Sequence, residues 1–304
     1  MAALLDARAP LYGRASTVVV PTPFHGSDLA DLWSADPQSA FWVDAALGGL
    51  PGFRQLVDPP AQDLDAWMVE EVLSPGSPLL DTAELALADH YEAGPKAQIN
   101  AIVAAIAAGE QSFAGIARQS GIKHSALARP LESMRRSGLL TKIPDVLRAK
   151  RDRWTLADPH LRFWLSVVAP RRFELSAGRA STIWESVANT TWPSNVAGPR
   201  WREVVRHHLI LTRSWPTTGV TVLADPINKT GIELDIVAMD GNKVVAIGEA
   251  KLRPLTNRDA ARLDHARNLL DAPDAELILA SPQGTTANGE HTAITTNDIY
   301  ASRD

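Results

Sequence analysis

The most informative part of the sequence is Gly231-Ile-Glu-Leu-Asp235-Ile-Val-Ala-Met-Asp240-Gly-Asn-Lys-Val-Val-Ala-Ile-Gly-Glu249-Ala-Lys251. Two apolar segments flank an Asp-Gly turn signal, which predicts an antiparallel β-hairpin. Side chains alternate between the two faces of a strand, so Glu249 and Lys251 share one face. Two carboxylates and a lysine within apolar strands need a reason, because unpaired buried charges are costly.

A divalent hard cation would supply that reason. Asp235 and Glu249 would give Mg²⁺ or Mn²⁺ two oxygen ligands, with positions left for water and a phosphate. Lys251 would position or activate the attacking water. The alternative is an ion pair at the end of the hairpin. We therefore take Asp235, Glu249 and Lys251 as candidate catalytic residues, and the two acids as candidate metal ligands.

Metal binding also requires a particular register. A two-residue turn at the Asp-Gly dipeptide would place Asp235 on the wrong face. A three-residue loop over 240–242, with Asn242 in the left-handed region, pairs Asp235 with Ile247 and leaves it diagonal to Glu249 on one face. The sequence therefore predicts the three-residue loop, or a five-residue variant with the same register.

Around this hairpin, residues 158–304 read as a compact α/β domain. Apolar spacing predicts helices over 180–189, 199–211 and 257–270, and strands over 220–223, 233–239, 243–251 and 276–280. Trp154, Trp164 and Trp201 lie on amphipathic faces and are expected in the core.

Residues 95–157 read as a winged helix-turn-helix. Helices are predicted over 97–108, 112–119 and 125–137, with a glycine turn at 120–122, and strands over 139–143 and 153–156. The third helix would enter a DNA major groove. The expected phosphate contacts are Lys123, Arg129, Arg135, Arg136, Arg151 and Arg153. The alternative is a solvated basic face, or one that packs on a neighbouring region.

Charge is segregated along the chain. Residues 1–94 hold three basic residues against 14 acidic ones, a net charge of −11. Residues 95–172 hold 14 basic residues against five acidic ones, a net charge of +9. The remainder is −3, which gives −5 in total. A basic block between acidic ones indicates either a polyanion site, for which nucleic acid is the candidate ligand, or docking of the basic block on the acidic one, and charge alone does not separate the two. The winged-helix pattern makes that nucleic acid double-stranded DNA.

Residues 1–94 hold one short predicted strand, 17–20, and predicted helices from Asp36-Pro37, over 63–73 and over 81–91. One strand among several helices does not make a complete domain. This segment looks like the end of something larger.

The hairpin motif resembles the PD-(D/E)XK nuclease superfamily, whose fold is that of the restriction endonucleases. More narrowly, the segment 153–164, Gly198-Pro199, Glu233-Leu-Asp235 and Gly248-Glu-Ala-Lys251 resemble a prokaryotic, archaeal-type AAA-like ATPase family. That family combines an ATPase module, a winged helix and a nuclease-like C-terminal domain of unknown function. Residues 9–14 and 47–52 are similar to the tail and lid of its ATPase module. The resemblance implies three parts: an ATPase-lid-like remnant (1–94), a winged helix (95–157) and a nuclease-like domain (158–304).

Two departures limit what this resemblance implies. The phosphate-binding loop of the ATPase core would precede this chain, which has no Gly-x-x-x-x-Gly-Lys-Ser/Thr motif, so we expect no nucleotide-binding residues and no ATP binding. The family typically has an acidic residue four positions after the glycine that corresponds to Gly198, and Arg202 occupies that position here. Glu203 is one residue further on, about 100° around the helix, an offset that can turn it away from the metal, and it is kept as a candidate accessory acid.

The composition excludes other classes. The chain has no cysteine, which rules out thiol nucleophiles and disulfide frameworks and suits a reducing cytoplasm. Neither a secretory signal nor a membrane-spanning stretch is apparent. We expect a cytoplasmic, DNA-binding α/β plus α protein, either a Mg²⁺- or Mn²⁺-dependent deoxyribonuclease or a catalytically silent regulatory remnant of an ATPase-family protein. The sequence leaves its oligomeric state open.

Overall fold

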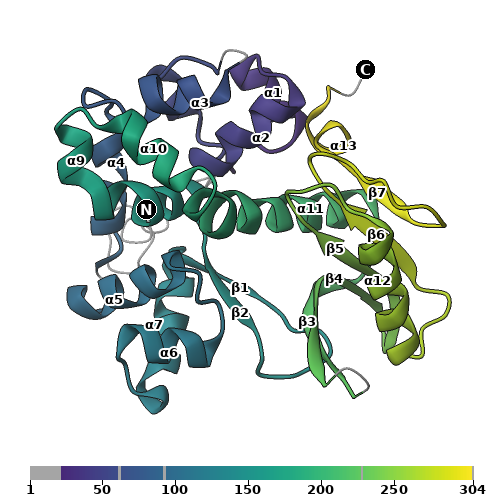
Figure 1. Ribbon diagram of the computed structural model, residues 1–304. Helices are drawn as coiled ribbons and strands as arrows, with labels where there is room; N and C mark the ends of the chain where they lie inside the picture. The colour runs from purple at the N-terminus through teal and green to yellow at the C-terminus, as the bar shows by residue number, and fades with distance from the viewer. Residues whose placement is uncertain (1–21, 61–62, 92–93, 227–228, 303–304) are drawn as a thin grey trace, which may run out of the picture.

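The computed structural model describes residues 22–60, 63–91, 94–226 and 229–302. The predicted strand at 17–20 and the family-like segment at 9–14 lie outside these residues. The described part is a mixed α/β structure with a five-stranded mixed sheet and a small two-stranded sheet (Figure 1). Within it, no helix is long and apolar enough to cross a membrane.

The acidic N-terminal part is helical. It contains α1 (Ser27–Trp33), α2 (Pro37–Ala46), η2 (Pro51–Gln55), α3 (Leu64–Trp67), η3 (Met68–Val72) and α4 (Leu79–Ala88). The predicted start of α2 is confirmed, because Asp36 accepts hydrogen bonds from the N–H groups of Gln38 (2.9 Å) and Ser39 (3.2 Å). The seven-residue α1 was not predicted, since so short a helix shows little periodicity.

Residues 95–157, which we call the basic unit, form α5 (Lys96–Ala107), α6 (Phe113–Ser120), α7 (His124–Arg136), β1 (Leu140–Ile143) and β2 (Arg153–Leu156). The two strands pair antiparallel. All five predicted elements are confirmed to within one residue at each end. The glycine turn is confirmed too, since Gly121 caps α6 with a φ of 71°. Leu127, Leu131 and Met134 give α7 its fully buried face.

A run of helices connects the basic unit to the large sheet. It contains α8 (Pro159–Phe163), η5 (Trp164–Val168), η6 (Ala169–Arg171), α9 (Arg172–Ser176), α10 (Ala180–Val187), η7 (Trp192–Ala197) and α11 (Gly198–Thr212). Trp154, Trp164 and Trp201 lie in the hydrophobic core, as predicted. That core is continuous from Trp33 in α1 to Ile236 in the sheet.

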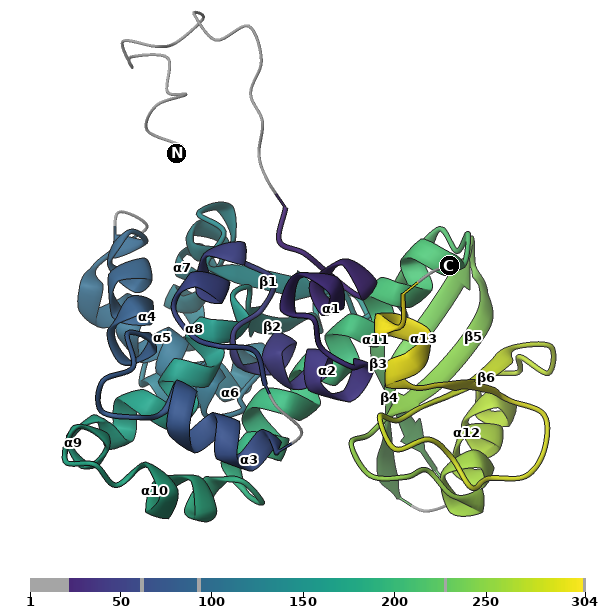
Figure 2. The ribbon, with the colours of Figure 1, turned by 90° about the horizontal axis from the view of Figure 1, so that it is seen from above.

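The large sheet has the strand order β3 (Thr217–Asp225), β4 (Thr230–Asp240), β5 (Lys243–Ala250), β6 (Glu276–Ala280) and β7 (Thr292–Ile294). The first three strands are antiparallel, and β6 and β7 continue parallel to β5. Helix α11 packs on one face, and α12 (Asn257–Leu269) covers the other (Figures 1 and 2). The short β7 and α13 (Thr296–Tyr300) were not predicted.

The turn of the β4–β5 hairpin differs from the prediction. Asp240 pairs with Lys243, so the loop has two residues rather than three. Positive φ falls on Gly241 (58°), and Asn242 is not left-handed. Glycine adopts positive φ without steric cost, so the turn places it where the conformation requires it.

A β-bulge corrects the register further along the hairpin. Residue Val245 is an extra residue in β5, which shifts the pairing by one. Ile236 consequently pairs with Gly248, and the next step of this register brings Asp235 opposite Glu249. The predicted pairing of Asp235 with Ile247 is therefore wrong. The bulge nevertheless brings the two acids together.

The loop of the β1–β2 hairpin docks on the free edge of β3. Val146 donates its N–H to the carbonyl of Val220 (3.2 Å), and Val220 donates to the carbonyl of Pro144 (3.0 Å). The Thr221 hydroxyl donates to the buried Asp145 carboxylate at 2.8 Å. The basic unit is thus joined to the edge of the large sheet.

Candidate active site and nucleic-acid interface

Asp235, Glu249 and Lys251 meet where the end of β5 lies beside the middle of β4. The ammonium of Lys251 lies 2.8 Å from Glu249 Oε1 and 3.6 Å from Asp235 Oδ2. Both carboxylates are buried, with side-chain exposures of 6% for Asp235 and 3% for Glu249. The three residues chosen from the hairpin pattern therefore form one cluster.

A second bulge positions Asp235. Gly219 pairs with Val237 and Thr221 with Leu234, so Asp235 and its neighbour Ile236 together oppose one residue of β3. Bulges bend a strand and redirect its side chains, and they are common beside active sites. The redirected carboxylate accepts a hydrogen bond from the N–H of Ala250 at 3.1 Å, which fixes it against the end of β5.

Arginines surround the two carboxylates. Arg202 Nε lies 3.6 Å from Asp235 Oδ1, and Arg262 Nη1 donates to both oxygens of Glu249 at 2.9 and 3.0 Å. The buried Arg206 donates to the backbone carbonyl of Asp235 at 2.9 Å. Sequence reasoning missed Arg206 and Arg262. Arg206 lies one turn after Arg202 on the same side of α11, and that spacing was the available signal.

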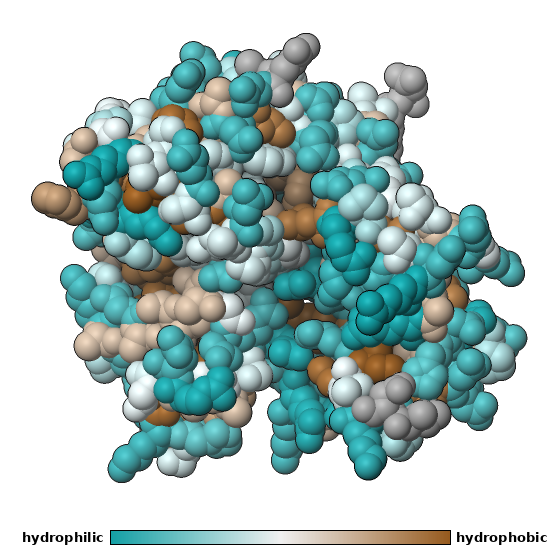
Figure 3. Space-filling view, viewed as in Figure 1, coloured by the Kyte–Doolittle hydropathy of each residue, from teal (hydrophilic) through white to brown (hydrophobic). Residues whose placement is uncertain are grey.

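Charge at this centre is positive toward solvent. Lys251, Arg202 and Arg262 are three cations for two carboxylates, and their side chains are 37%, 27% and 39% exposed. An approaching phosphate would therefore meet cations first. Figure 3 shows mostly hydrophilic residues with some hydrophobic ones between them over the sheet side of this face, and a hollow between the helical half and the sheet.

The ionisation of Lys251 limits its chemistry. Burial works against its charge, but the nearby Asp235 and Glu249 outweigh burial and raise the pKa of the ammonium. Burial is also the main cause that raises the pKa of Glu249, assisted by Asp235. The raised pKa favours the protonated ammonium, which can donate to a phosphate or orient a water.

Two carboxylates suit a partly hydrated Mg²⁺ or Mn²⁺, which proteins commonly bind through one or two carboxylates plus phosphate oxygens and water. The described residues supply only these two carboxylate ligands for a metal. No group of three Asp, Glu, His or Cys residues arranged for a metal occurs in the described part of the chain. Arg202 contacts Asp235 from the position where the family resemblance implies a third acid.

Glu203 does not join the centre, contrary to its expected role as an accessory acid. Its carboxylate accepts hydrogen bonds from Arg162 (2.6 Å) and from the Thr155 hydroxyl (3.0 Å), and it lies 3.5 Å from Arg200. Burial opposes its ionisation, yet Arg162 and Arg200 hold the pKa of Glu203 below its ordinary value. The one-residue offset on α11 turns Glu203 toward β2 instead of toward the sheet.

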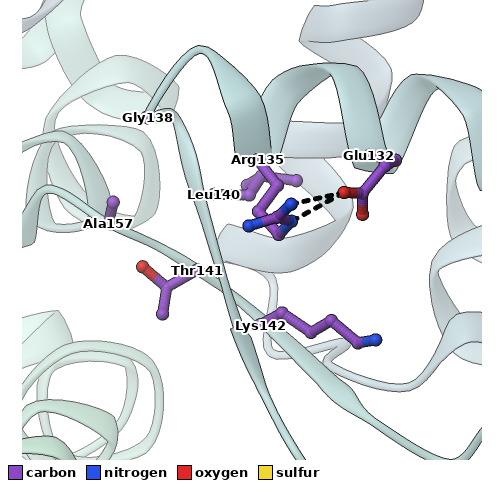
Figure 4. A pocket seen from close by; sticks show the side chains of 7 residues that line it. All are labelled: Glu132, Arg135, Gly138, Leu140, Thr141, Lys142 and Ala157. Carbon is purple, nitrogen blue, oxygen red and sulfur yellow. Dashed lines mark hydrogen bonds and ion pairs between the residues drawn. The ribbon is translucent and has the colours of Figure 1, made fainter.

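The expected DNA contacts on α7 and its preceding turn reach the surface. Lys123, Arg129, Arg135 and Arg136 are all exposed. Arg135 is bound by Glu132, which accepts from its Nε (2.9 Å) and Nη2 (2.5 Å) (Figure 4). That bond is the main cause of a lowered Glu132 pKa and a raised Arg135 pKa. The charge of Arg135 is thus partly compensated by Glu132 of the same helix.

The two expected wing contacts differ from each other. Arg151 is exposed, but Arg153 is half-buried and its guanidinium lies 3.1 Å from Glu233 of β4. Because Arg153 pairs with Glu233, its guanidinium is less available than that of Arg151 to bind a DNA phosphate. Instead, Arg153 joins the basic unit to the strand that carries Asp235.

Comparisons with known proteins add little. No family model matches the chain, and no curated protein matches it. Among solved structures it has a weak likeness to protein VC1899 from Vibrio cholerae, with 15% identity and a TM-score of 0.22. The match covers 68% of this chain and 48% of VC1899, so this chain spans about half the length of that protein. A similarity this weak supports no conclusion about fold or function.

Proposed function

We propose that the chain is a DNA-binding protein with a PD-(D/E)XK nuclease-like centre that hydrolyses DNA phosphodiesters with Mg²⁺ or Mn²⁺. The observation that carries the proposal is the meeting of Asp235, Glu249 and Lys251 at the bulged end of the hairpin. In this reading, residues 158–304 form a restriction-endonuclease-like domain, and residues 95–157 form a winged helix-turn-helix that holds double-stranded DNA.

The order of the elements supports the winged-helix part. Three helices with a glycine turn before the third, followed by an antiparallel hairpin, are the expected parts of that motif. The net charge of +9 over 95–172 and the exposed cations of α7 favour a polyanion. The Arg153–Glu233 contact ties this unit to β4, so bound DNA would lie near the centre.

The acidic and basic residues of the centre would have different roles. Asp235 and Glu249 would hold the metal, which when bound supplies a Lewis acid for the phosphate and lowers the pKa of a bound water. Lys251, protonated, would donate to the phosphate and stabilise its developing negative charge. Arg206 and the N–H of Ala250 hold Asp235 in place through its carbonyl and carboxylate.

A second candidate is a catalytically silent DNA-binding regulator descended from an ATPase-family protein. Arg202 and Arg262 favour it, because they already compensate the two carboxylates that a metal would need. Residues 1–94 would then be the lid-like part that the family resemblance implies, and these 304 residues are not expected to bind ATP because they contain no phosphate-binding loop motif.

Cleavage of DNA by the purified chain separates these candidates. We expect cleavage that requires Mg²⁺ or Mn²⁺ and that is lost in both Asp235→Ala and Lys251→Ala. Asp240→Ala and Lys243→Ala are matched controls, because both residues lie on the same hairpin, are exposed and lie outside the centre. Cleavage that survives the first two changes would point to another site, and absence of cleavage would favour the silent regulator.

A further inference from the structure

A cavity of about 520 Å³ lies between the basic unit and the large sheet, apart from the Asp235 centre. Its walls come from the start of α6, the first residue of α7, the β1–β2 loop and β3 (Figure 1). Pockets of this size accommodate small organic ligands. Nothing in the proposed cleavage chemistry uses this cavity.

One side of the cavity is aromatic and apolar. Phe113 and His124 line it with their rings 4.6 Å apart in an edge-on arrangement. Val222 of β3 lines the same cavity. Aromatic rings pack well against such walls, since offset and edge-to-face contacts at these distances are favourable.

The charged groups at the cavity leave a positive balance. Asp145 is bound by the Thr221 hydroxyl and by the N–H groups of Leu147 and Arg148. The carboxylate of Asp152 lies 2.7 Å from the ammonium of Lys142. Both acids on the cavity wall are therefore engaged within the protein.

Two cations on the same wall lack such partners. Lys150 and Arg151 are exposed, and neither has an ion pair within the described residues. The third cation on the wall, Arg153, is held by Glu233. Lys150 and Arg151 are thus the groups available to an anionic ligand.

We propose that this cavity binds a small aromatic anion, that is, a planar ring that carries a carboxylate directly or, as in a nucleotide, a phosphate through a sugar. The ring would pack on Phe113 and His124, and the anionic group would pair with Lys150 and Arg151. Since the cavity walls belong to both the basic unit and β3, such a ligand would brace the two against each other.

Isothermal titration calorimetry of the full chain tests the proposal with two arms. The first uses AMP, GMP, CMP and UMP, and the second uses benzoate and salicylate. We expect saturable binding in one arm, with adenosine and inorganic phosphate each binding at least about tenfold more weakly, because each lacks one half of the recognised chemistry.

Matched variants locate the binding. Ala114→Trp fills the cavity from an exposed position on α6 and should abolish binding, whereas Ala128→Trp, exposed on α7 outside the cavity, should not change it. Combined Lys150→Glu and Arg151→Glu should weaken binding at least about tenfold. Circular dichroism confirms that each variant is folded.

Several results would overturn the proposal: no binding in either arm, equal binding of adenosine, or binding that survives Ala114→Trp. Loss of duplex binding in Ala114→Trp, with DNA displacing the ligand, would assign the cavity to the DNA interface instead. Because cleavage by the Asp235 centre is measured separately, failure here leaves that proposal intact.

Discussion

Arg202 and Arg262 are the two arginines that would compete with a cation for the carboxylates of the Asp235 centre. The Arg202 guanidinium lies 3.6 Å from Asp235 and adds positive charge where a metal would bind. Arg262 does the same for Glu249 at 2.9 Å. Opposite charges at such distances stabilise ionised carboxylates, but they also compete with a metal for the same oxygens.

Replacement of Arg202 should therefore strengthen metal binding. Arg202→Glu removes the competing cation and adds a carboxylate, and we expect Mn²⁺ to bind about tenfold more tightly, about 1.4 kcal/mol. Isothermal titration calorimetry with Mn²⁺ measures this. Arg213→Glu makes the same charge change beyond the end of α11 and is the control. An unchanged affinity in Arg202→Glu would show that Arg202 does not compete with a metal.

At the scale of elements, the docked β1–β2 loop depends on a close approach at Gly219. A Cβ on this residue would lie 2.3 Å from the carbonyl oxygen of Pro144 and 2.7 Å from Val146 Cγ1. The Gly219 φ is not positive, so its role is steric. The hydrogen bonds between Val220 and the loop require this contact.

We expect Gly219→Ala to destabilise the protein by about 1–3 kcal/mol, because the backbone carbonyl cannot move aside without loss of the docking hydrogen bonds. Urea unfolding measures the change. Gly52→Ala is the matched control, since a Cβ there meets no atom within 4 Å. Equal stability of the two variants would mean that the loop is not docked in solution.

Helix α7 carries the DNA-binding part of the proposal. Arg136→Ala should lower the slope of log affinity against log salt for duplex DNA by about 0.9, the value for one lost phosphate contact. Arg135→Ala should have a smaller effect, because Glu132 already holds Arg135. Fluorescence anisotropy across a salt series measures both.

Arg172→Ala is the control for this experiment, because Arg172 belongs to the basic block but contacts Asp81 and Glu84 outside α7. If Arg135 and Arg136 changed together to Ala left affinity and slope intact, α7 would not be the DNA-binding helix.

Elements with strong local signals could be predicted from the sequence, and irregular ones could not. Periodic apolar spacing sufficed to predict α7 and α11, and the chemistry of the hairpin singled out Asp235, Glu249 and Lys251, whose side chains lie together in the structure. The bulge at Val245 has no local signature, so the predicted register was wrong. The one-residue offset of Glu203 from Arg202 was visible in the sequence, but its partner Arg162 is distant in sequence and was not.

For the molecule as a whole, charge divides the chain into segments, but the larger of the two hydrophobic cores in the described residues runs through all of those segments. One hydrophobic core includes Trp33, Ile102 of the basic unit and Ile236 of the large sheet. A chain of buried charges follows the same path, since Arg200 contacts both Asp44 of α2 and Glu203. The segregation of charge along the sequence predicts which surfaces are acidic or basic. It does not predict the shared core, which depends on contacts between segments that are distant in sequence.

This continuity places the Asp235 centre at a junction of the molecule. Helix α11 contributes Arg202 and Arg206 to the centre and Glu203 to the contact with β2. The Arg153–Glu233 pair adds a second link between β2 and the sheet. DNA bound to the basic unit would consequently lie close to the cations of the centre.

The most direct test of the central claim, that Asp235 and Glu249 form a metal centre, is a Mn²⁺ titration followed by electron paramagnetic resonance of the unbound ion. We predict one bound Mn²⁺ per chain, lost in Asp235→Asn and in Glu249→Gln and retained in Asp240→Asn. Thermal unfolding of each variant confirms the fold. No binding by the unaltered chain, or binding unchanged in the first two variants, would contradict the account.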